Sequence, residues 1–127
     1  MGLPKRILFL LEDSPSSHIR FFEGMRMALG FSVSHPGMEM VLMGPSVRVF
    51  GPVRPGEIGL PPELLEFFPL FDDLDIRIFA DRESLSRYSP SHAPPPSIHS
   101  IERSEILEKI RSADILIPFG PGGRSTW

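Results

Sequence analysis

The feature that most constrains the fold is the run from Ile7 to Leu11, which is apolar at every position. A strand with one face in water alternates apolar and polar residues, whereas a strand covered on both faces reads as a continuous apolar run. Residues 38–43 and 113–119 form two further runs that are mostly apolar. We expect the last run to be buried in its middle, with Pro118 marking a sheet edge or a strand end, because proline donates no ladder hydrogen bond. The three runs predict strands covered by helices on both faces.

Segments with helical periodicity lie between the apolar runs. Apolar residues recur at helical spacing from Ile19 to Leu29, which predicts an amphipathic helix that ends at Gly30. The other predicted helical segments are residues 63–71, 84–88 and 104–112. Alternating strands and helices favour a three-layer α/β domain with a mostly parallel sheet. Its predicted strands are residues 5–11, 38–43, 75–80 and 114–119, with a further short strand at 97–101.

The length of 127 residues predicts one domain, since domains average about 150 residues. We assign residues 1–119 to this domain and residues 120–127 to a flexible tail. The glycines of the tail are similar to those of a phosphate-binding loop, but no helix follows them. Prolines interrupt the middle of the chain, so we expect no long regular element between Pro45 and Pro62. For the same reason the helix over 63–71 should end early or kink at Pro69.

Charge and cysteine content exclude several classes of function. Thirteen Lys and Arg residues against sixteen Asp and Glu residues give a net charge of −3, which disfavours nucleic-acid binding. The chain contains no cysteine, so it has no disulfide, no cysteine-ligated metal and no thiol nucleophile. No apolar run reaches the ~20 residues of a membrane span, and Glu12 and Asp13 close the first run where a signal peptide needs small residues. We expect a cytoplasmic protein that contacts neither nucleic acid nor membrane.

Four stretches of the sequence together resemble the DsrE/DsrF/DsrH family, which includes the TusBCD sulfur-relay subunits. They are KRILFLLEDSPSSHIRFFEGMRMALGF, VLMGPSV, DIRIFADRESLSR and SEILEKIRSADILIPF. They correspond to the first strand, loop and helix of the family, its second strand and turn, its third strand, and its closing helix and strand. The resemblance covers most of residues 5–119 and implies a flavodoxin-like fold. It also implies a homo- or hetero-oligomer with DsrE-like subunits.

The same resemblance implies transfer of a persulfide sulfur on a cysteine at the end of the third strand. Asp81 takes that position here, or Ala80 if the alignment moves by one residue, and Ser84 followed by Leu85 favours Asp81. Neither residue forms a persulfide, because the chemistry requires a thiol. We therefore predict no catalytic residue and no cofactor. The predicted function is that of a non-catalytic structural or binding subunit related to sulfur relay.

The alternative is a small enzyme or sensor that binds an anionic metabolite in the loop after the first strand. Ligands of open α/β sheets bind at the carboxyl ends of the strands, where a helix N-terminus offers free N–H groups to an anion. The candidate ligand-binding residues by this rule are Asp13, Ser14, Ser16, Ser17, His18, Gly44, Asp81 and Arg82. The simpler interpretation is that Asp13, Ser14 or Ser16 caps the following helix. Asp81 and Arg82 would then form exposed ion pairs at the rim.

The four histidines lack the spacing that metal ligands require, so we predict no metal site and solvated histidines in loops. His18 is the exception worth testing, because an imidazole in the predicted crevice could act as an acid or a base near neutral pH.

Phenylalanines are concentrated in one short segment. Phe67, Phe68 and Phe71 lie within five positions that also include Leu70, too many large apolar residues for one short helix to turn inward. Exposed apolar clusters usually mark interfaces, so we predict that these phenylalanines contact a partner subunit. The alternative is that they are buried in the core of the chain itself.

Overall fold

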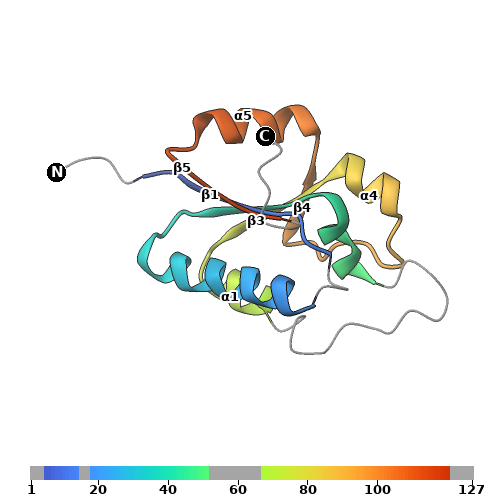
Figure 1. Cartoon of the computed structure of the whole chain (residues 1–127), viewed down its shortest axis with the longest axis horizontal. Coiled ribbons are helices and arrows are strands. Elements are labelled where there is room, and N and C mark those ends of the chain that lie inside the picture. Colours follow the sequence, from blue (N-terminus) through green and yellow to red (C-terminus); the bar gives the residue numbers. More distant parts are fainter. Residues whose placement is uncertain (1–4, 15–17, 52–66, 121–127) are drawn as a thin grey trace.

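The computed structural model of the chain describes residues 5–14, 18–51 and 67–120. At its centre is a five-stranded sheet with the order β4-β3-β2-β1-β5, in which every neighbouring pair is parallel (Figure 1). The strands are β1 (Ile7–Leu11), β2 (Glu39–Leu42), β3 (Arg77–Asp81), β4 (Ile98–Ile101) and β5 (Ile115–Phe119). The predicted α/β architecture is confirmed, with β3 ending one residue later than predicted.

Helices cover both faces of this sheet. They are α1 (His18–Ser34), the 3₁₀ helix η1 (Gly44–Phe50), α3 (Phe67–Asp73), α4 (Arg82–Tyr88) and α5 (Arg103–Ser112). Figure 1 shows α1 and α5 on opposite faces. Ile7, Phe9 and Leu11 belong to the core that includes α1, α3 and η1, whereas Leu8 and Leu10 pack beneath α5. Both faces of β1 are buried, which explains why it has no polar position. Among the described residues, no helix is long and apolar enough to cross a membrane.

Helix α1 does not end at Gly30 as predicted but continues to Ser34. A Cβ at Gly30 would have no heavy atom within 4 Å, so this glycine lies on the open side of the helix. Glycine there costs helix stability only about 1 kcal/mol, and the buried opposite side of α1 outweighs that cost. The chain turns instead at Gly37, whose φ of +93° favours glycine.

Prolines interrupt the helices less than predicted. Pro69 is the third residue of α3, and the helix continues to Asp73, so the expected early end is wrong. In the first turn the missing N–H of proline has no intrahelical partner to lose. Pro45 likewise lies at the start of η1, a 3₁₀ helix of seven residues, which is compatible with the prediction of no long regular element after Pro45. Residues 63–66 of the predicted helix lie outside the described residues.

Strand β5 lies at the edge of the sheet, as Pro118 predicted. Ile115 N–H donates to the Arg6 carbonyl at 3.1 Å, and Glu12 N–H donates to the Phe119 carbonyl at 2.9 Å. Odd-numbered residues of β5 therefore direct their backbone groups to β1, and Pro118 faces away, where its missing N–H costs no ladder bond. The prediction of a buried middle is wrong, because edge strand β5 has no fully buried residue.

Candidate functional site

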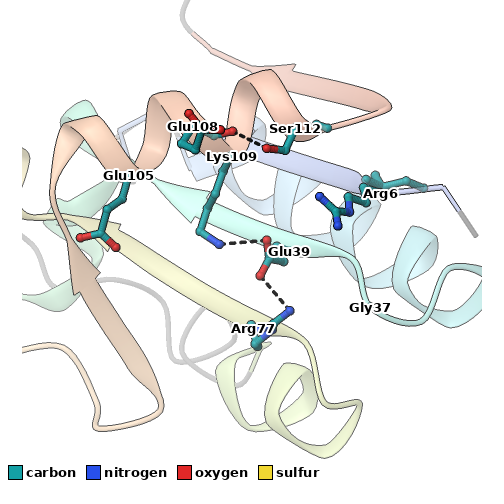
Figure 2. Close-up of a pocket in the computed structure, with 10 residues that line it drawn as sticks. Arg6, Gly37, Glu39, Arg77, Glu105, Glu108, Lys109 and Ser112 are labelled. Atoms are coloured by element: carbon teal, nitrogen blue, oxygen red, sulfur yellow. Dashed lines mark hydrogen bonds and ion pairs between the residues drawn. The ribbon is translucent and has the colours of Figure 1, made fainter.

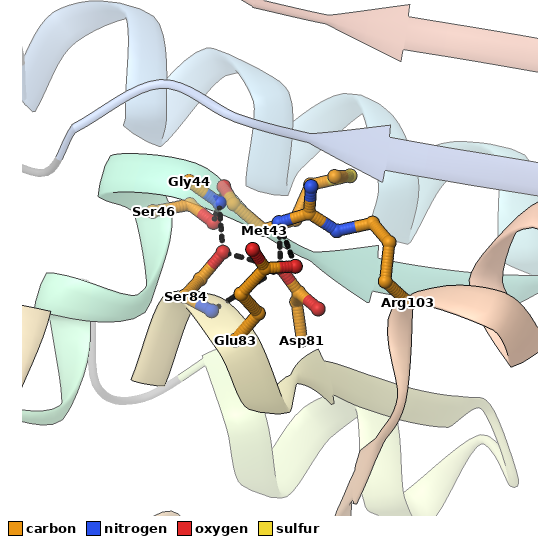
Figure 3. A network of polar contacts seen from close by, with 7 residues as sticks. All are labelled: Met43, Gly44, Ser46, Asp81, Glu83, Ser84 and Arg103. Carbon is orange, nitrogen blue, oxygen red and sulfur yellow. Dashed lines mark hydrogen bonds and ion pairs between the residues drawn. The ribbon is translucent and has the colours of Figure 1, made fainter. Parts of the chain in front are cut away.

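The carboxyl ends of the strands bring several predicted residues to one edge of the sheet. Asp81 is the last residue of β3, and Gly44 begins η1 just after β2. Figure 3 shows Gly44, Asp81, Ser84 and Arg103 converging there from η1, β3, α4 and α5. We call these four residues the Asp81 network.

The carboxylate of Asp81 is the centre of this network. Its side chain is fully buried and caps α4, since Oδ2 accepts a hydrogen bond from Ser84 N–H at 3.2 Å. The same oxygen accepts from Ser84 Oγ at 2.5 Å and from Arg103 Nη2 at 2.6 Å. The interpretation of Asp81 as an exposed rim residue is therefore wrong, because α5 covers it and supplies its cation.

Ser84 extends the network to the neighbouring strand. Its hydroxyl accepts a hydrogen bond from Gly44 N–H at 2.8 Å, so the start of η1, just after β2, and α4 are joined through one side chain. Gly44 has a φ of +60°, a left-handed conformation that glycine adopts without strain. The structure thus brings Gly44 and Asp81 together, although through a residue that the sequence reasoning missed.

The pKa of Asp81 is shifted by opposing effects. Burial raises the pKa, but the hydrogen bonds from Arg103 and Ser84 outweigh burial and hold the pKa below its ordinary value. The Asp81 hydrogen bond correspondingly raises the pKa of Arg103. The second oxygen, Oδ1, is buried and has no hydrogen-bond partner. The network therefore contains an ionised carboxylate with one oxygen fully used and the other free.

The acidic residues after β1 are in a different electrostatic state. Burial raises the pKa of Glu12, which Asp13 raises further and Arg103 lowers. Burial also raises the pKa of Asp13, which Arg20 lowers. Asp13 is buried, and its Oδ2 has no hydrogen-bond partner. This part of the edge holds carboxylates that are less well compensated than Asp81.

Arg82, a further predicted ligand-binding residue, is not part of the Asp81 network. Arg82 forms an exposed ion pair with Glu102 at 3.3 Å, as the simpler interpretation predicted, and donates to the Ser100 carbonyl. Ser16, Ser17 and the side chain of His18 lie outside the described residues. Ser14 lies just after β1 and is half-buried. In the described part of the chain, no cluster of three His, Asp or Glu side chains could hold a metal ion.

The predicted phenylalanine interface is corrected by the structure. Phe68 and Phe71 are buried in the core of the chain, and Phe68 stacks on Phe50 with 6.1 Å between ring centroids. Phe68 is therefore covered by Phe50 of η1, and not by a partner subunit as predicted. The side chain of Phe67 lies outside the described residues.

Comparison with known proteins supports the fold. No protein-family model and no curated protein matches the sequence. The fold is similar to that in the crystal structure of the ychN protein from E. coli, with a TM-score of 0.74 and 14% sequence identity. The similarity covers 91% of this chain and 99% of the ychN chain. The chain is therefore a single α/β domain with the flavodoxin-like, DsrE-like fold.

Proposed function

We propose that this chain is a non-catalytic structural or binding subunit of a cytoplasmic assembly related to sulfur relay. The observation that carries the proposal is the state of Asp81 at the carboxyl end of β3. The resemblance to DsrE-like proteins aligns this position with a cysteine that carries sulfur. Here the position holds a buried carboxylate that Ser84 and Arg103 hold in place. If the alignment moves by one residue, the position is Ala80, which is also fully buried and has no reactive group.

The chemistry of the Asp81 network favours a structural role. A carboxylate forms no persulfide, and no cysteine elsewhere in the chain replaces it. Three donors hold Oδ2 of Asp81, from the backbone and side chain of Ser84 and from Arg103, so the side chain has no freedom to reach a substrate. The network instead joins η1, β3, α4 and α5 at one edge, which is what a rigid binding subunit requires.

An exposed apolar surface between α1 and β5 supports assembly with other subunits. Met27 and Phe31 of α1 and Ile115 of β5 are exposed, and we call them the α1–β5 patch. A Cβ at Gly24 would lie 3.0 Å from Phe119, so this side of α1 lies against β5. Met27 and Phe31 follow Gly24 at helical spacing, and Ile115 shares the strand face of Phe119. Exposed apolar residues grouped in this way are typical of interfaces.

Co-expression with a cysteine-bearing DsrE-like protein tests the proposal. We expect the two chains to elute together in size-exclusion chromatography with light scattering. Phe31→Glu and Ile115→Glu should each weaken this association. The matched control is Val33→Glu, which alters an exposed α1 residue on the other side of the helix. The proposal fails if the chain stays monomeric alone and with such partners.

The alternative, a small enzyme or sensor that binds an anionic metabolite in the loop after β1, has less support from charge. Glu12 and Asp13 lie at that position and repel an anion. A thermal-shift series with phosphate, sulfate and small carboxylates distinguishes the two functions. A ligand at about 100 times its Kd adds about 2.7 kcal/mol of stability, which is easily measured. Such stabilisation, without any subunit association, would favour the alternative.

A further inference from the structure

A groove lies at the opposite edge of the sheet, where β1, β2 and β3 begin beneath α5 (Figure 2). Its volume is about 570 Å³, in the range of small-ligand sites. Charged side chains dominate its lining, namely Arg6, Glu39, Arg77, Glu105, Glu108 and Lys109. We call it the amino-edge groove. It contains no residue of the Asp81 network, and the proposed function assigns no role to it.

Ion pairs inside the chain occupy the centre of the groove. Glu39 is partly buried, with 19% of its side chain exposed, and accepts a hydrogen bond from Lys109 Nζ at 3.0 Å. Arg77 Nη2 lies 3.1 Å from the other oxygen of Glu39. The ammonium of Lys109 also lies 4.1 Å from the ring centroid of Phe79. These contacts hold two cations in place, and each keeps N–H donors that Glu39 does not use.

The two ends of the groove carry opposite charges that other described residues do not neutralise. Arg6 lies at the end near Ser112, and Glu105 lies at the other end (Figure 2). Neither the guanidinium of Arg6 nor the carboxylate of Glu105 forms an ion pair with another residue in the described part of the chain. Glu108 differs, because Arg111 lies 3.6 Å from its carboxylate. The groove therefore presents a free cation and a free anion at opposite ends.

The length of the groove follows from α5. Glu105 and Ser112 are seven residues apart on this helix, which corresponds to about 10 Å at 1.5 Å per residue. An extended peptide advances about 3.3 Å per residue, so about three residues span this distance. We infer that the amino-edge groove binds a short peptide with free termini. Its carboxylate contacts Arg6, its ammonium contacts Glu105, and its carbonyl oxygens accept from Arg77 and Lys109.

Other small ligands match this charge pattern less well. A simple anion at Arg6 leaves Glu105 unused and lies close to Glu39, which repels it. A simple amine at Glu105 meets Lys109 one helical turn away, on the same side of α5. A ligand with one charge of each sign meets the same neighbours, but it pairs with both Arg6 and Glu105, whereas a simple ion pairs with only one of them.

Titration of the ¹⁵N-labelled chain with triglycine tests the inference by chemical-shift changes at groove residues. The comparison ligands are N-acetyltriglycine, which lacks the ammonium, and triglycinamide, which lacks the carboxylate. We expect each modification to weaken binding about tenfold, because each removes one charge-assisted hydrogen bond. Equal binding by the three ligands, or no shift change at the solubility limit of triglycine, would overturn the inference.

Two variants assign each terminus to its residue. Glu105→Gln should weaken triglycine about tenfold and remove its advantage over N-acetyltriglycine, while Arg6→Met should remove its advantage over triglycinamide. Glu23→Gln and Arg87→Met, exposed residues on α1 and α4, are the matched controls. The assignment is wrong if a control weakens binding as much as the groove variant, or if either groove variant leaves both preferences intact.

Discussion

The two edges of the sheet use the same construction with different burial. At each edge a carboxylate on a strand is held by a cation from α5, Arg103 at its first turn and Lys109 at its last. Asp81 at the carboxyl edge is fully buried, whereas Glu39 at the amino edge is 19% exposed. Asp81 also caps a helix, which Glu39 does not.

This difference indicates which edge is built for rigidity. A buried carboxylate whose partner is removed leaves an uncompensated charge, while a partly exposed one recovers water. The Asp81 network therefore belongs to the stability of the fold, and the amino-edge groove retains charges for a ligand. Four predictions test this comparison, in order of expected effect.

The largest effect is expected for Asp81→Ala, which should lower the free energy of unfolding by about 3 kcal/mol. Loss of the α4 cap contributes about 1 kcal/mol, and loss of the charge-assisted bond to Arg103 about 2 kcal/mol. Arg103 is partly exposed, so its recovery of water keeps the loss below that of a fully buried pair. Urea denaturation at pH 7 measures the change. Asp72→Ala, an exposed aspartate at the end of α3, is the control and should stay within about 0.5 kcal/mol.

The pH dependence of stability should have opposite signs at Asp81 and Asp13. The pKa of Asp81 lies below 3.8 in the folded chain, so its contribution is present above pH 3.8 and is lost as pH falls through the folded pKa. The pKa of Asp13 lies above 3.8 in the folded chain. The folded state therefore loses stability as pH rises from 3.8 through the folded pKa of Asp13. Asp13→Asn should therefore be more stable than the parent chain at pH 7, and Asp81→Asn less stable.

Urea denaturation between pH 3 and pH 7 measures both differences. The stabilisation by Asp13→Asn should disappear at low pH, where the parent carboxyl is also protonated. A destabilised Asp13→Asn at pH 7 would show that this carboxylate has a compensating partner after all.

Lys109→Met should cost about 1 kcal/mol, less than Asp81→Ala. The lysine loses its ion pair with partly buried Glu39 and its contact with the Phe79 ring, each worth about 0.5 kcal/mol. Because Glu39 is within reach of solvent ions, the loss of unfolding free energy caused by Lys109→Met should be smaller in 1 M NaCl. Arg111→Met is the control, since Arg111 and Glu108 are both largely exposed. Equal losses in the two variants would mean that burial of Glu39 adds nothing.

Much of the sheet could be predicted from the sequence because burial on both faces leaves a local signal. The apolar run of β1 required cover on each side, and the two cores provide it. Pro118 also left a local signal. A proline has no N–H to donate to a second neighbouring strand, so the residue itself indicates an edge strand. Such signals need no knowledge of distant contacts.

The site and the cover of the core could be predicted only in part. The sequence placed Asp81 at the correct edge. Its contact with Arg103 could not be predicted, because Arg103 lies 22 residues away on α5 and no local pattern indicates the pair. Ser84 left a weaker signal, an Asp followed three residues later by a cap donor. The burial of Phe68 depends on Phe50, which precedes it by 18 residues. Tertiary contacts of this kind account for the errors at Asp81 and at Phe68.

The smallest effect is expected for Arg82→Met, at the same edge as Asp81 and adjacent to it in sequence. Arg82 pairs with Glu102 at 3.3 Å, and 58% of the arginine side chain is exposed. Exposed pairs contribute well under about 1 kcal/mol because water competes for both partners, so we expect a change below about 0.5 kcal/mol in urea denaturation. Measuring Asp81→Ala under the same conditions shows whether the burial of a residue, and not its place at the carboxyl edge, sets the loss of stability. A loss from Arg82→Met that approached the loss from Asp81→Ala would show that the whole carboxyl edge is coupled, because burial alone assigns these neighbouring residues very different contributions.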